Sequence, residues 1–163
     1  MPTHVWSGPA RRIAVASVIV LAAIIASSRP AFAQISDAVI SAESELQLLE
    51  RADGGAYQRY LITLTSNAGV VVLTTNKDGA VSTRQAPAAD YVALWRELQD
   101  NNLDLLGNAT PVQTAPDGSR FTVKYRAGGA SGEFSVSGVD SLGDTRYRAI
   151  VRAVIGFAAA HSE

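Results

Sequence analysis

The chain has 163 residues, of which 14 are basic and 15 acidic, and it contains two histidines and no cysteine. A net charge of −1 gives no electrostatic basis for binding nucleic acid. The lack of cysteine excludes disulfides and thiol chemistry, and two histidines offer few ligands for zinc. A domain of about 130 residues can still bury roughly two thirds of its unfolded surface and fold on a hydrophobic core alone.

The first 33 residues have the parts of a secretory signal peptide. Arg11 and Arg12 precede an apolar run at residues 13–26, and Ala31 and Ala33 have the small-x-small spacing that signal peptidases accept. We therefore expect cleavage after Ala33, a periplasmic or secreted protein, and contact with the membrane only through this segment before cleavage. The alternative is a retained anchor, but the run is shorter than the about 20 residues that span a bilayer.

Alternating patterns predict strands in the first half of the remaining chain. Residues 34–44 are small and polar, which favours a flexible or loosely docked leader. Residues 45–51 favour a strand over a helix that begins at Ser41. Residues 57–65 and 70–75 predict a hairpin, and residues 80–84 either add a short strand or run along an edge.

The second half predicts two helices with another hairpin between them. Residues 89–102 have a helical apolar stripe, and the leucines at 103–106 are expected to close one end of the core from a loop. A loop at 111–119 leads to strands at 120–126 and 133–139, joined by residues 127–132. Residues 144–160 predict the last helix, with Asp144 as its N-cap.

These elements predict an α+β fold in a single domain over residues 45–163. Each predicted helix has one apolar face, and the strands alternate between a dry and a wet face. The simplest packing is a two-layer sandwich, in which an antiparallel sheet of four or five strands carries two helices on one face.

Several short motifs resemble a family of small exported bacterial β-β-α-β-β-α domains of unknown function. The motifs are Leu-Leu-Glu-Arg at residues 48–51, Tyr60, the turn at 67–69 and Leu-Asp-Leu at 103–105. The resemblance spans roughly residues 45–157 and implies no activity. The family's first loop carries a cysteine pair, whereas this chain has Asp-Gly-Gly-Ala at 53–56.

The residue types that perform most catalysis are scarce. His4 belongs to the signal segment and His161 lies near the C-terminus, which leaves no convincing triad or zinc site, and we expect no catalytic residue, cofactor or metal. The turn at 76–79 lacks the alternate acids of a calcium loop. Paired carboxylates for glycan hydrolysis would have to come from neighbours, either Asp100 with Asp104 or Glu43 with Glu45.

Basic residues gather late in the chain and suggest a patch for an anionic partner. The candidates are Lys124, Arg126, Arg148 and Arg152. The alternative is a solvated face whose charges are balanced by Asp140 and Asp144.

The export signal, the one-sided sheet and the missing catalytic residue types predict a non-enzymatic exported domain. We expect it to bind another protein or an envelope component through the open face of the sheet or through an edge strand. The alternative is a carboxylate-dependent hydrolase that acts on envelope glycans. A small-ligand carrier would need an apolar pocket of a few hundred Å³ between the sheet and the helices.

Overall fold

The computed structural model describes residues 34–52, 57–107 and 118–162. The predicted signal segment and its cleavage site, with Ala31 and Ala33, lie outside this part of the chain, as does most of the predicted loop at 111–119. No helix within the described residues is both long enough and apolar enough to cross a membrane.

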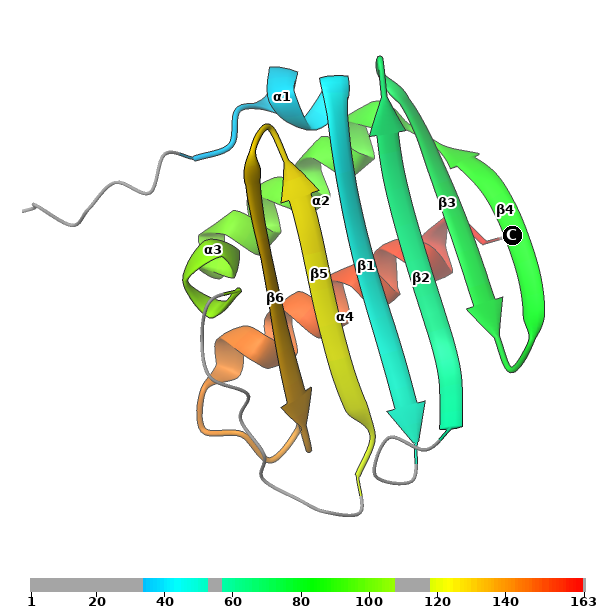
Figure 1. Cartoon of the computed structure of the whole chain (residues 1–163), viewed down its shortest axis with the longest axis vertical. Coiled ribbons are helices and arrows are strands. Elements are labelled where there is room, and N and C mark those ends of the chain that lie inside the picture. The colour runs from blue at the N-terminus through cyan, green and yellow to red at the C-terminus, as the bar shows by residue number, and fades with distance from the viewer. Residues whose placement is uncertain (1–33, 53–56, 108–117, 163) are drawn as a thin grey trace, which may run out of the picture. The chain divides into compact units, whose positions relative to one another are not determined.

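A single antiparallel sheet forms one layer of the fold, with the strand order β4-β3-β2-β1-β5-β6 (Figure 1). The strands are β1 Glu43–Ala52, β2 Tyr57–Asn67, β3 Val70–Lys77, β4 Ala80–Ala86, β5 Arg120–Ala127 and β6 Ala130–Ser137. The helices of the described residues are α1 Asp37–Ala42, α2 Ala88–Asp100, α3 Leu103–Leu106 and α4 Thr145–Ala160.

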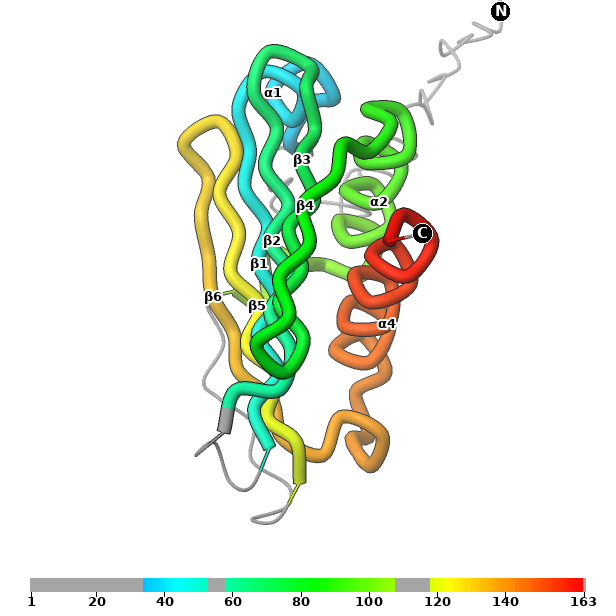
Figure 2. Tube along the Cα trace, turned by 90° about the vertical axis from the view of Figure 1, so that its right-hand side faces the viewer, coloured from blue at the N-terminus to red at the C-terminus, as the bar shows by residue number. Residues whose placement is uncertain are grey.

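The helices α2 and α4 lie on the same side of the sheet, and no helix of the described residues covers the other side (Figure 2). The alternation in β1 explains this arrangement, because Ser44, Leu46 and Leu48 are buried while the residues between them are partly exposed. The predicted α+β architecture, with an antiparallel sheet and helices on one face, is confirmed. The uncovered side is called the open face below.

The sheet has six strands rather than the predicted four or five. The difference arises at β4, which pairs with β3 from Ala80 to Ala86 without a break in register. Asp78 and Gly79 both have positive φ, as a two-residue hairpin turn of this type requires. That turn directs the chain straight back along β3, so the segment forms a full strand.

The segment 34–44 also differs from the predicted flexible leader, because α1 and the start of β1 lie within it. Ser36 caps α1 by accepting from the Val39 amide at 3.4 Å, and the side chain of Ile40 is fully buried. Ile35, Val39 and Ile40 lie among small and polar residues without a clear period, and composition alone therefore favours a leader. The structure makes Ile40 part of the core.

The core fills the space between the sheet and the helices with aromatic and branched side chains. Trp95 and Tyr91 of α2 are fully buried, and the Trp95 ring packs edge-on against Tyr125 of β5 with centroids 6.2 Å apart. At the other end, Tyr147 of α4 packs edge-on against Phe134 of β6 at 5.2 Å. The predicted apolar stripes of both helices therefore face the sheet.

Two connections are more regular than the sequence predicts. The leucines at 103–106 form α3, in which Leu103 and Leu106 are buried while Leu105 is 46% exposed. The expected six-residue loop at 127–132 is a two-residue turn, because Gly128 and Gly129 both have positive φ and Ala127 pairs with Ala130.

Candidate binding surface

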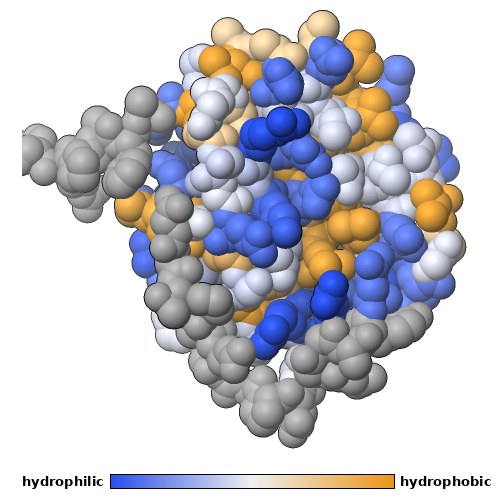
Figure 3. All heavy atoms as spheres, viewed as in Figure 1, coloured by the Kyte–Doolittle hydropathy of each residue, from blue (hydrophilic) through white to orange (hydrophobic). Residues whose placement is uncertain are grey.

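Side chains of all six strands form the open face, which Figure 3 shows as a mixture of hydrophilic and hydrophobic residues. Register places these side chains in rows that run across the sheet. One row contains Thr83, Thr74, Thr63, Gln47, Lys124 and Glu133, in order from β4 to β6. The halves on either side of β1 differ in charge.

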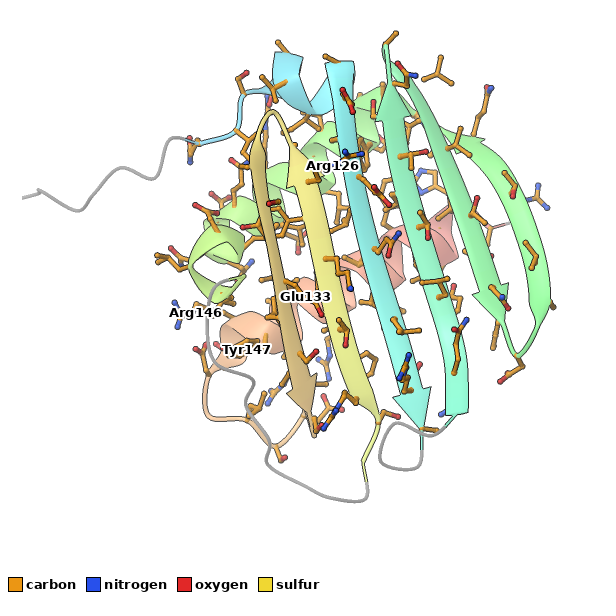
Figure 4. The ribbon with its side chains drawn as sticks, viewed as in Figure 1. Arg126, Glu133, Arg146 and Tyr147 are labelled. Atoms are coloured by element: carbon orange, nitrogen blue, oxygen red, sulfur yellow. The ribbon has the colours of Figure 1, made fainter. Side chains whose placement is uncertain are left out.

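The half formed by β1, β5 and β6 is charged, and its charges pair with one another. The Lys124 ammonium lies 3.0 Å from Glu133, and the Arg126 guanidinium lies 3.6 Å from Glu45 and 3.9 Å from Glu43. Figure 4 shows Arg126 and Glu133 on this side of the sheet. Exposed pairs of this kind contribute little free energy, but they occupy both Lys124 and Arg126 with acidic partners of the same face.

The half formed by β2, β3 and β4 carries no charged side chain along three successive rows. Thr74 and Thr83 lie opposite each other with their hydroxyl oxygens 3.3 Å apart. The whole set, here called the neutral patch, is Leu61, Thr63, Thr65, Val72, Thr74, Asn76, Val81, Thr83 and Gln85. Soluble surfaces usually carry charge on about a quarter to a third of their residues, so an uncharged area of this extent is unusual.

The two edges of the sheet are protected to different degrees. On β6 the Glu133 amide donates to the Gly107 carbonyl at 2.9 Å, and α3 packs against the same strand. On β4 every residue from Ala80 to Gln85 is exposed. Unpaired strand edges are sites for strand addition, and β4 is the accessible one among the described strands.

The structure does not bring the predicted basic patch together. Lys124 and Arg126 lie on the open face, whereas Arg148 and Arg152 belong to α4, in the layer on the opposite side of the sheet (Figures 2 and 4). The sequence shows that all four side chains are basic, but it does not show which face of the sheet Lys124 and Arg126 occupy.

Arg148 and Arg152 fix the turn before α4. The Arg152 guanidinium lies 3.0 Å from the Asp140 carboxylate, and Arg148 donates to the Asp140 carbonyl at 2.6 Å. Asp144 pairs instead with Arg146, so Arg148 and Arg152 share one acidic partner, Asp140. These contacts tie both arginines to the turn before α4.

His161 links the end of α4 to α2. Its Nδ1 lies 2.9 Å from the Phe157 carbonyl oxygen and its Nε2 lies 3.1 Å from Asp90 Oδ2. These two contacts join the C-terminal end of α4 to α2.

Of the candidate carboxylates, Glu43 and Glu45 share one basic partner, and Asp100 lines a separate hollow. Glu43 and Glu45 both contact Arg126. A hollow of about 160 Å³ on the charged half is lined by only one acid, Glu45. A second hollow is lined by Asp37 and Asp100, but Arg96 donates to Asp37 at 3.2 Å.

Within the described ranges no three His, Asp or Glu side chains lie close enough to hold a metal ion. No protein-family model matches the chain, and no curated protein matches it either. The resemblance to small exported domains remains a prediction.

The sequence alone does not predict the neutral patch, because the patch depends on the register between strands. The available signal was the threonine at alternate positions in the predicted strands, at Thr63, Thr65 and Thr74. Only the pairing of β2 with β3 and of β3 with β4 places these residues side by side.

Proposed function

We propose that this protein is an exported, non-enzymatic domain that binds another protein through the neutral patch. The observation that carries the proposal is the uncharged part of an otherwise charged open face, on the side of the sheet that no helix covers. Export rests on the signal-like segment at residues 1–33.

The chemistry of the patch suits a protein surface. Its hydroxyl and amide groups can exchange hydrogen bonds, while Leu61, Val72 and Val81 offer methyl groups for packing. A partner seated on the neutral patch would desolvate none of its side chains as ions, and unpaired buried charge is costly at an interface. Protein interfaces are depleted of charged residues at their centres for the same reason.

Glycan hydrolysis is the less favoured alternative. That reaction needs two carboxyl groups about 5 to 10 Å apart across a bound sugar. Glu43 and Glu45 share Arg126, and the hollow beside them has one acid among its lining residues. These contacts favour binding over catalysis.

The test compares two lysine substitutions on the open face. Thr63→Lys puts a charge into the neutral patch, and Ser131→Lys puts the same charge on β6 in the other half as a control. We expect a protein of the cell envelope to be retained by wild type and by Ser131→Lys, and to be lost with Thr63→Lys. Retention of isolated envelope polysaccharide in that same pattern, polysaccharide degradation, or equal retention by all three forms would contradict the proposal.

A further inference from the structure

The backbone of β4 has donors and acceptors that β3 does not use. Lys77 and Ala80 flank the two-residue turn and therefore form a hydrogen-bonded pair. Hydrogen-bonded and non-hydrogen-bonded pairs alternate from that point, so every second residue directs its N–H and C=O away from β3. The residues with outward backbone groups are Val81, Thr83 and Gln85.

The β4 edge has little of the usual protection against pairing, with Arg84 as its one charged residue. Its sequence Ala-Val-Ser-Thr-Arg-Gln-Ala contains no proline and no lysine, and its register with β3 has no bulge. Val81 is 65% exposed, the most among the large apolar side chains of the described residues. On the opposite edge the Glu133 amide donates to the Gly107 carbonyl, and α3 packs against β6. Of the two edges in the described part of the sheet, β4 is therefore the less covered.

We propose that β4 pairs with β4 of a second copy of this chain, antiparallel and with the two-fold axis at Thr83. In this register Thr83 faces Thr83 of the second copy, and Val81 faces Gln85 in both directions. Every outward backbone group of the strand then has a partner, because each such pair exchanges two hydrogen bonds. The proposal goes beyond the partner-binding function and does not depend on it.

The neighbouring registers fit less well. Moving the axis to Ser82 leaves the outward groups of Gln85 unpaired. Moving it to Arg84 places that arginine opposite itself, and like charges directly opposite each other destabilise a strand pair. With the axis at Thr83, Arg84 faces Ser82 of the second copy, and the two Arg84 side chains are not directly opposite each other.

The pairing has a consequence for the open face. Side chains of Val81, Thr83 and Gln85 lie on that face, in the same rows as the neutral patch. Edge-to-edge pairing joins the neutral patches of the two copies at the centre and leaves the charged halves outside. The threonine row of one copy then continues into that of the other.

Single cysteines test the register, because the chain has none of its own. Residues directly opposite in a hydrogen-bonded pair have Cα atoms about 5.5 Å apart, within disulfide range. We expect Thr83→Cys in the purified full-length protein to form a covalent dimer on mild oxidation. Val81→Cys is the control, since its counterpart would lie roughly four residues along the strand, about 13 Å away.

Charge substitution at the axis gives a second readout, measured as dimer mass by light scattering. Thr83→Lys and Thr83→Glu should each weaken dimerisation by about tenfold, and an equimolar mixture should restore it, because the opposite charges then face each other. Wild-type protein that remains monomeric at about 1 mM, or equal crosslinking of the two cysteine variants, would overturn the proposal.

Discussion

The Tyr91 hydroxyl lies 3.0 Å from Ser44 Oγ, although 47 residues separate them in the chain. Ser44 Oγ also lies 2.6 Å from the Ile40 carbonyl, to which it donates its only proton. Tyr91 must therefore be the donor to Ser44. This chain of hydrogen bonds ties α2 to β1 and to the end of α1 inside the core.

Ser44→Ala should destabilise the domain more than Tyr91→Phe. The serine variant leaves the buried Tyr91 hydroxyl without its acceptor, which costs about 1 to 3 kcal/mol. The phenylalanine variant removes the hydroxyl and keeps the bond from Ser44 to Ile40, at about 1 kcal/mol. Urea unfolding of the two variants measures the difference, and a larger loss for Tyr91→Phe would contradict the assigned donor.

Burial raises the pKa of Tyr60, Tyr91 and Tyr125 above the ordinary value of 10.0. A raised pKa means that the folded state keeps these protons at a pH where the unfolded chain releases them. The free energy of unfolding should therefore fall as the pH rises above about 10. Absorbance titration of tyrosinate in the folded and the unfolded protein checks that the folded-state pKa values are the higher ones. In Tyr91→Phe, the free energy of unfolding should fall less steeply with rising alkaline pH.

Asp144 stabilises the start of α4 and should do so only above its own pKa. The carboxylate accepts from the Arg146 amide at 3.0 Å, and the Arg146 side chain holds the pKa of Asp144 below its usual 3.8. A lowered pKa means that this stabilisation is present above the unfolded value and is lost as the pH falls through the folded one.

Asp144→Ala should cost about 1 kcal/mol at neutral pH, and progressively less as acid protonates the wild-type carboxyl. Asp144→Asn is the matched control, because it retains the capping oxygen without the charge. Unfolding curves across an acid series measure both variants. A cost for Asp144→Ala that does not change with pH would rule out the ionised cap.

Gly128 and Gly129 should respond differently to alanine, although both have positive φ. A Cβ on Gly128 would lie 2.2 Å from Val39 Cγ1 on α1, whereas one on Gly129 would meet nothing within 4 Å. Gly129→Ala should cost about 1 to 2 kcal/mol for the left-handed backbone alone. Gly128→Ala should cost about 1 to 3 kcal/mol more because of the overlap.

Adding Val39→Ala should recover part of the loss in Gly128→Ala and none of the loss in Gly129→Ala. Thermal unfolding of the single and double variants separates the two contributions. Equal losses for the two glycine variants would show that the turn does not pack against α1.

The spacing of apolar residues in the sequence was sufficient to predict most of the helices and strands. Buried positions such as Tyr91 and Trp95 recur at helical spacing, and Ile62 and Leu64 alternate as a half-buried strand requires. The elements that were missed, such as α1, or left open, such as β4, have short or polar sequences. α1 contributes one buried side chain, Ile40, and β4 contributes only Ala86, so neither shows a clear apolar period.

The site was harder to predict than the fold, because it depends on which segments lie side by side. Lys124 belongs to a predicted strand and Arg152 to a predicted helix, but the sequence does not show that Lys124 points to the face of the sheet away from that helix. The neutral patch requires the register of three strands, and the asymmetry of the edges requires the contact of Gly107 with β6. A one-dimensional pattern contains none of these relationships.

The central place of β1 has a consequence for how the chain folds. Strands β1 to β4 are joined in sequence, and so are β5 and β6, so most of the ladder can close through short loops. Only the seam from β1 to β5, where Ser44 meets Ala127, must bring distant segments together. Folding kinetics should therefore be governed by closure of that seam, and substitutions along it should slow refolding more than substitutions in either hairpin.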